Sequence, residues 1–261
     1  MRQVEPSVEL LAKPSIDWEA MRTYLDEVGG TSWADRVEAA ESPDAEDLLE
    51  FSGRMCYRSW EPGLNPNVSR VRTDSASYLG NVISSQHGSV LEHANFTFVL
   101  HNVSRVLTHE LIRHRAGSAF SQESLRYVRL ADIPFWFPDW AREDPELMER
   151  SLAVLDTLEE HQKWMAEHFG LDEEGTKFAH KKHMTSFMRR FAPEGLATGI
   201  VYTANLRSLR HVIEMRTAKG AEEEIRLVFN KIGEIMQTEA PAIFSDYEIV
   251  DGEWIPGTRK A

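Results

Sequence analysis

One stretch decides how this chain is interpreted: Arg113-His114-Arg115-Ala116-Gly117-Ser118-Ala119-Phe120-Ser121-Gln122-Glu123-Ser124-Leu125-Arg126-Tyr127. It contains three arginines, one histidine and a single acid, although the whole chain carries a formal net charge of -13. Its serines, glutamine and glycine add hydrogen-bonding groups beside the planar N–H forks of the arginines. A cationic stretch in an acidic protein indicates an anion-binding site. On charge alone, however, a solvated loop with scattered charges is the commoner explanation.

The composition is typical of a globular protein. The chain has 261 residues, 42% of them hydrophobic and 27% charged, which is enough material for one large domain. The acidic balance argues against a nucleic-acid partner, because phosphate backbones select basic surfaces. The single cysteine, Cys56, excludes an intramolecular disulfide and favours a cytoplasmic protein. The first residues lack the apolar core of a signal peptide, and no run approaches the roughly 18 apolar residues that span a membrane.

Hydrophobic periodicity and capping residues predict a mixed α/β (α+β) chain. Apolar and β-branched runs predict strands at 8–11, 94–100 and 196–204, and the segment 127–133 is expected to be extended. Helices are predicted at 18–28, from 44 onward, 74–86, 104–112, 147–169, 172–191, 206–217 and 221–240. The arginine- and serine-rich stretch is expected to leave the 104–112 helix as a loop, and the last dozen residues carry no strong pattern. Without repeats or an obvious linker, residues 1–261 are expected to form a single domain.

The histidines do not form a recognisable metal motif. His109-Glu110-Leu111-Ile112-Arg113-His114 resembles the HExxH zinc motif but places its second histidine one residue too far along. A spacing of five residues turns the second imidazole away from the helical face that holds the first. Four others, His87, His93, His101 and His180, show no ligand spacing. No metal site is therefore predicted, and a metal hydrolase remains a third-ranked alternative.

Nucleophile and nucleotide-loop motifs are also missing. Cys56 is flanked by Met55 and Tyr57, and a lone cysteine is more often a buried apolar residue than a reactive thiol. The sequence contains no Gly-x-Ser-x-Gly elbow and no Walker or Rossmann glycine pattern. A bound nucleotide would therefore be held by arginines and serines. Further candidates outside the stretch are Arg189, Arg190, Arg207, Arg210 and Arg216, although helical arginines are normally solvated.

The quoted stretch resembles the signature of flavin-dependent thymidylate synthases, in which Arg-His-Arg is followed by a spacer, a serine, one residue and Arg-Tyr. Three further segments resemble this family in the expected order. They are His87-Gly88-Ser89-Val90-Leu91-Glu92-His93 before a Phe-x-Phe strand, Arg189 four residues before Pro193, and Asn205-Leu206-Arg207 through His211 to Arg216. Residues 53–59 and 240–244 fit as well, so the resemblance covers about 48–247.

The resemblance implies a subunit with a central, largely antiparallel sheet flanked by helices, assembled as a homotetramer with active sites at subunit interfaces. It also implies an enzyme that methylates C5 of the uracil ring of dUMP to give dTMP. Methylenetetrahydrofolate is the implied carbon donor, and FAD reduced by NADPH the implied source of hydride. No protein nucleophile is needed in this chemistry, which agrees with the missing cysteine motif.

The resemblance also assigns roles to individual residues. Arg216 is expected to be catalytic, binding the uracil edge and stabilising its developing negative charge. The residues expected to bind the nucleotide are Ser124, Arg126 and Arg189 at the phosphate, with Glu110, Arg113, Gln122 and Glu123 nearby. The residues expected to contact FAD are His87, Ser89, Arg113, His114, Arg115, Gln122, Asn205, Arg207 and His211, with His87 also near the folate.

Two features depart from the family pattern. The spacer 116–120 is one residue longer than expected, and Gly117 could absorb the resulting bulge. Gly220 stands where the family often has a histidine near the flavin. A reshaped loop would relax selection against the ribose 2′-hydroxyl, so one alternative is a methylase acting on UMP as well as dUMP, as in nucleoside-antibiotic pathways. Another is a nucleotide- and flavin-binding protein that has lost catalysis.

Overall fold

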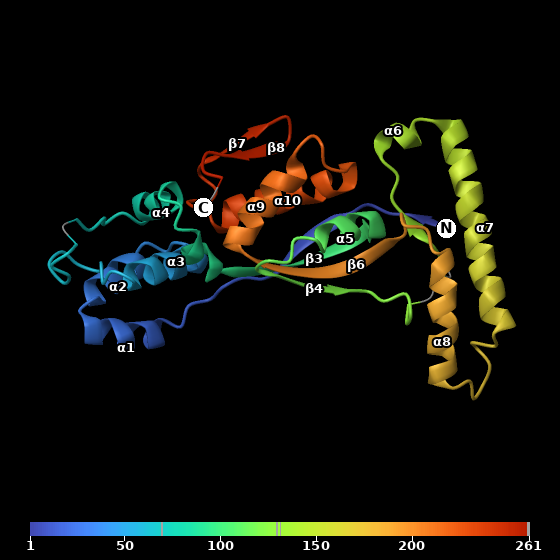
Figure 1. Cartoon of the computed structure of the whole chain (residues 1–261), viewed down its shortest axis with the longest axis horizontal. Coiled ribbons are helices and arrows are strands. Elements are labelled where there is room, and N and C mark those ends of the chain that lie inside the picture. The colour runs from blue at the N-terminus through green and yellow to red at the C-terminus, as the bar shows by residue number, and fades with distance from the viewer. Residues whose placement is uncertain (69, 129, 131, 260–261) are drawn as a thin grey trace.

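A computed structural model describes residues 1–68, 70–128, 130 and 132–259. Its centre is a four-stranded sheet in the order β2-β3-β6-β4, in which every neighbouring pair is antiparallel. The strands are β2 (Ser7–Ala12), β3 (Asn95–Ser104), β6 (Ala197–Asn205) and β4 (Ser118–Gln122). The predicted central antiparallel sheet flanked by helices is therefore confirmed (Figure 1).

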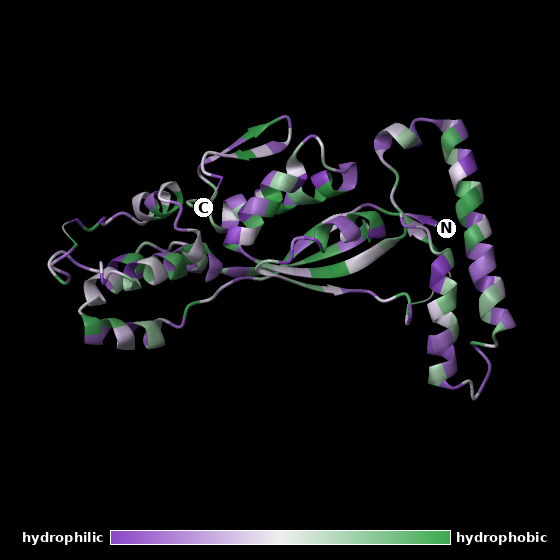
Figure 2. Ribbon diagram, viewed as in Figure 1, coloured by the Kyte–Doolittle hydropathy of each residue, from purple (hydrophilic) through white to green (hydrophobic). Residues whose placement is uncertain are grey.

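Helices cover the sheet because its apolar side chains need a second layer. The helices packed around it are α3 (Asp44–Met55), α4 (Ser75–Ser84), α5 (Arg105–Leu111), α9 (Leu206–Thr217) and α10 (Glu223–Glu239). The main core joins fully buried Phe96 and Phe98 on β3 to Phe229 and Ile232 on α10. Figure 2 shows hydrophobic residues along the central strands and a mixture of both kinds on the surrounding helices.

The two ends of the molecule have smaller cores of their own. At one end, α1 (Trp18–Val28) and α2 (Thr31–Glu38) pack around Leu25, Trp33 and Trp60. At the other end, α7 (Pro145–His168) and α8 (Phe178–Met188) form a helical pair, in which Gln162 donates to the backbone oxygen of Met188 at 3.0 Å (Figure 1).

Short elements complete the fold. These are β1 (Arg2–Gln3) paired in parallel with β5 (Pro134–Phe135), the 3₁₀ turns η1 (Gly88–Glu92) and η2 (Arg189–Phe191), α6 (Asp139–Arg142), and the antiparallel hairpin of β7 (Tyr247–Val250) and β8 (Glu253–Pro256). Within the described residues, no helix is long and apolar enough to cross a membrane.

Predicted helix starts agree well with the structure. Asp74 caps α4 by accepting from the Ser77 backbone N–H at 2.6 Å, and Ser104 caps α5 by accepting from Leu107 at 3.1 Å. Each cap satisfies a backbone donor that the helix itself leaves free.

Four expectations were wrong or incomplete. Residues 118–122 are not loop but strand β4, because their backbone pairs with β6. The helix predicted at 172–191 begins only at Phe178, after Gly170 and Gly175 adopt positive φ angles of 58° and 82°. The α2 helix and the β7–β8 hairpin were not predicted. The predicted extended segment 127–133 includes residues 129 and 131, which lie outside the described residues, while Tyr127 donates to the Ser124 backbone oxygen in a turn.

Candidate functional site

Arg216 is fixed by three hydrogen bonds to the end of α5 and the residues after it. Its Nε donates to His114 Nε2 at 2.8 Å, one terminal nitrogen donates to Glu110 Oε2 at 2.6 Å, and the other donates to the Glu110 backbone oxygen at 3.2 Å. The Arg216 side chain is 18% exposed. Although Arg216 lies more than 100 residues from Glu110 and His114 in sequence, α9 and α5 bring the three side chains together.

His114 is neutral in this arrangement. Burial, reinforced by the positive charge of Arg216 and by His211, lowers the pKa of His114 to about 4. The bond from Arg216 requires Nε2 to be an acceptor, which assigns the imidazole proton to Nδ1. A neutral imidazole and one carboxylate thus hold a single guanidinium cation.

A cavity of about 620 Å³ lies beside this network. The loop after α5 and the first turns of α9 form most of its walls. Six of the residues predicted to contact a cofactor line it: Arg113, His114, Arg115, Asn205, Arg207 and His211. Their donors and cations face a common space.

Gly117 holds the loop in this position. Its φ angle is +65°, and its backbone oxygen accepts from the Asn205 N–H at 3.1 Å. Ser208 Oγ donates to the neighbouring Ala116 oxygen at 2.6 Å, and Asn205 caps α9 by accepting from the Ser208 N–H at 2.9 Å. A Cβ at position 117 would lie 2.4 Å from both Asn205 Nδ2 and Ser208 Oγ, so glycine is required at this point of the spacer.

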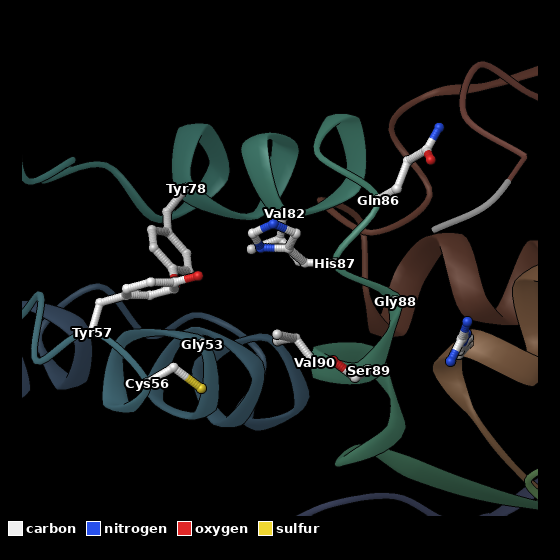
Figure 3. A pocket seen from close by; sticks show the side chains of 11 residues that line it. Gly53, Cys56, Tyr57, Tyr78, Val82, Gln86, His87, Gly88, Ser89 and Val90 are labelled. Carbon is white, nitrogen blue, oxygen red and sulfur yellow. The ribbon is translucent and has the colours of Figure 1, made fainter.

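A second cavity of about 440 Å³ adjoins the first, because Arg207 lines both. His87 and Ser89 lie here rather than in the larger cavity. Figure 3 shows the side chains of His87, Tyr57 and Tyr78 in the space between α3 and α4, with Cys56 at its edge. His87 and Ser89 are therefore the two predicted cofactor residues that line the second cavity instead of the first.

Two of the predicted nucleotide residues, Gln122 at the end of β4 and Glu123 directly after it, are tied to neighbouring elements. Gln122 Nε2 donates to Thr108 Oγ1 at 3.1 Å, and Glu123 Oε2 accepts from the Gly199 N–H at 3.1 Å. Neither residue lines the two cavities described above. Gln122 is thus held beside α5, and Glu123 beside β6.

The three residues predicted to bind the phosphate, Ser124, Arg126 and Arg189, do not line one common cavity in this chain. Arg189 lines a third cavity of about 360 Å³. Ser124 and Arg126 do not line it, and the buried Nε of Arg126 has no hydrogen-bond partner among the described residues. Sequence reasoning missed two other candidates on its wall, Arg105 and His109, which the i,i+4 spacing on the predicted 104–112 helix could have revealed.

Arg210, weighed as a candidate because it shares a helical face with Arg207, has a structural role. Its side chain is only 2% exposed and forms two bonds to the Asp246 carboxylate at 2.8 and 3.0 Å. Its guanidinium also lies 4.8 Å from the centre of the Tyr247 ring. Among the residues that the structure describes, no group of His, Cys, Asp or Glu side chains is arranged to hold a metal ion.

Comparison with known proteins agrees with these features. A family model described as "Thymidylate synthase complementing protein" matches residues 39–242. A flavin-dependent thymidylate synthase of Corynebacterium glutamicum is 34% identical over 251 residues, covering 95% of this chain and 92% of the relative. One from Mycolicibacterium gilvum is also 34% identical, covering 95% of this chain and 89% of the relative.

Solved structures show the same fold. The UMP/dUMP methylase PolB from Streptomyces cacaoi, bound with 5-Br UMP, superposes with a TM-score of 0.63 at 16% identity, covering 93% of this chain and 94% of that one. Thymidylate synthase X from Helicobacter pylori, with FAD and dUMP, gives a TM-score of 0.55 at 20% identity, covering 77% and 93%. On the family model and the identity to its curated members, the chain is an enzyme that belongs to the flavin-dependent thymidylate synthase family.

Proposed function

We propose that this enzyme methylates C5 of the uracil ring of dUMP, with methylenetetrahydrofolate as carbon donor and NADPH-reduced FAD as the source of hydride. The observation that carries the proposal is the guanidinium of Arg216, which is fixed beside a cavity lined by the Arg113-His114-Arg115 segment. A fixed cation stabilises negative charge on a reacting ring without having to reorganise during the reaction.

The residues around the larger cavity fit a flavin dinucleotide. FAD carries a diphosphate, and arginine forks, a histidine ring and an amide suit such an anion. Arg113, Arg115 and Arg207 would hold the diphosphate, with His211 and Asn205 lining the same wall. His87 and Ser89 line the adjoining cavity, where the remainder of FAD or the folate would lie. When bound, reduced FAD supplies the hydride that completes the methyl group.

Arg216 is the proposed catalytic residue. Three of the five N–H groups of a guanidinium are used by His114 and Glu110, so two remain for the edge of the uracil ring. Glu110 would lie beside the nucleotide and keep the local charge balanced. Its carboxylate therefore restrains the same arginine that faces the substrate.

The nucleotide phosphate is proposed to lie near Arg189, with Ser124 and Arg126 contributing from the segment that follows β4. Because these residues do not share one cavity within a single chain, the proposal includes a homotetramer whose subunits complete each other's sites. Gln122 and Glu123 would line the nucleotide side of this assembly.

UMP is the second candidate substrate. At Gly220 an added Cβ would meet no heavy atom within 4 Å, so no side chain closes this part of the loop. The identity of 34% over 95% of the chain to a relative named as a flavin-dependent thymidylate synthase supports dUMP as the preferred substrate.

The test is the visible absorption spectrum of the purified protein, followed by turnover of dUMP and UMP with methylenetetrahydrofolate and NADPH. The expected result is a flavin band that shifts on addition of dUMP, and conversion of dUMP to dTMP. A protein that binds FAD but methylates neither nucleotide would be a binding protein without this activity. Failure to take up FAD would refute the proposal as a whole.

A further inference from the structure

His114 has two different neighbours on its two sides. Its ring lines the 620 Å³ cavity, and its Nε2 accepts the hydrogen bond from Arg216. His211 lies edge-on to it, with 6.0 Å between the ring centres, and lines the same cavity. Whatever occupies this cavity therefore lies against the residue that holds Arg216.

We propose that His114 is a positioning residue that couples occupancy of this cavity to the orientation of Arg216, so that flavin and nucleotide bind cooperatively. This inference rests on the proposed function for the identity of the two ligands. It assigns to His114 a role beyond contact with the cofactor.

The backbone makes His114 suited to this role. Its N–H donates to the Leu111 oxygen at 3.1 Å, which ties the residue to the last turn of α5. With the backbone fixed, the imidazole retains mainly the freedom to rotate about its side-chain bonds. A ligand packed against one edge of the ring removes that freedom and holds Nε2 towards Arg216.

The coupling must act in both directions. If a bound flavin favours the orientation of Arg216 that receives the nucleotide, then a bound nucleotide strengthens flavin binding by the same factor. Glu110 does not provide this link, because it contacts Arg216 but does not line the cavity. Among the residues of the described chain, only His114 both lines this cavity and hydrogen-bonds to Arg216.

The experiment measures the dissociation constant of dUMP by calorimetry, once for flavin-free protein and once for protein saturated with FAD. The ratio of the two constants is the coupling factor, and we expect about tenfold for the wild type. His114→Ala should lower this ratio clearly below the wild-type value, and the ratio that remains reports direct contact between the flavin and the uracil ring. His114→Gln, whose side-chain oxygen can accept from Arg216, should restore part of it.

The matched control is His211→Ala. His211 lines the same cavity but does not bond to Arg216, so this variant should bind FAD less tightly and keep the wild-type ratio once FAD is saturating. Circular dichroism and melting curves confirm that each variant is folded. A wild type without coupling, a His114→Ala variant that keeps it, or equal loss in His211→Ala would each overturn the inference.

Turnover of dUMP tests the proposed function independently of the coupling factor. The coupling factor is obtained from binding alone, so an enzyme that shows it without methylating dUMP would refute the proposed reaction and leave the role of His114 intact. Conversely, normal methylation with an unchanged ratio in His114→Ala would refute only the positioning role.

Discussion

Substituting Gly117 by alanine tests whether the longer spacer depends on its left-handed backbone. At φ +65° an alanine costs about 1 kcal/mol relative to glycine. Its Cβ would also lie 2.4 Å from Asn205 Nδ2 and Ser208 Oγ, which must move. Loss of the Asn205 cap costs about 1 kcal/mol, and loss of the Ser208 bond to Ala116 costs about 1 kcal/mol.

The sum is about 3 kcal/mol if the loop stays in place, which corresponds to a fall of roughly 6 to 12 °C in melting temperature for a chain of this size. If the loop moves instead, the cost appears as weaker FAD binding, because the same residues line the cavity. The assay is therefore a melting curve together with a flavin titration. Gly80→Ala is the control, since the φ angle of Gly80 is not positive and its Cβ would meet no heavy atom within 4 Å. Equal behaviour of the two variants in both measurements would refute the reasoning.

Three further substitutions probe the site and its support. Arg216→Ala should lower kcat by about 10²- to 10³-fold in a variant that still folds, and near-normal turnover of dUMP would contradict its catalytic role. Arg210→Met should destabilise the fold by about 3 kcal/mol or more, measured by urea unfolding, because it leaves the Asp246 carboxylate without its partner. Burial raises the pKa of Glu46 from 4.5 to about 7 even though its carboxylate accepts from the Ala242 N–H. The folded protein then keeps a proton that the unfolded chain has lost, so the contribution of Glu46 to stability should fall by about 3 kcal/mol as pH rises from 4.5 to 7. In Glu46→Gln that slope should shrink, and an unchanged slope in pH-dependent unfolding would refute the assignment.

The sequence predicted the elements whose signals are local. Ser104 and Asp74 indicate the starts of their helices, because a capping side chain accepts a hydrogen bond from a backbone N–H in the first turn of its own helix. Strand β4 was missed because Ser118–Gln122 has no β-branched residue, and its pairing with β6 decides its conformation. The β7–β8 hairpin carried a usable signal, since Asp251-Gly252 has positive φ at both positions, as a tight hairpin turn requires.

In the candidate site, too, features with a local sequence signal were predicted, whereas features that depend on distant contacts were not. The motif predicted cofactor contacts for residues of the 113–115 and 205–211 segments because it fixes their order, and in the structure these residues line one cavity. The roles of individual arginines depend on distant partners. Arg210 is neutralised by Asp246, 36 residues further along, whereas Arg216 meets Glu110 from more than 100 residues away. Helical spacing contains neither contact, so it could not separate the structural arginine from the candidate catalytic one.

Helix α5 keeps Arg216 and the third cavity at a constant separation. Backbone bonds from Arg105 and Val106 to the oxygens of Leu196 and Glu194, both at 3.1 Å, fix its first turn to the entry of β6. Arg105 faces the third cavity from this end, and Glu110 meets Arg216 at the other. Because backbone contacts set this distance, a longer spacer after residue 115 changes only the loop beyond α5. The extra residue expected in the spacer would therefore alter the wall of the large cavity, while Arg216 and the Arg189 cavity keep their spacing. A changed ligand preference should then arise in the loop rather than at the proposed catalytic arginine.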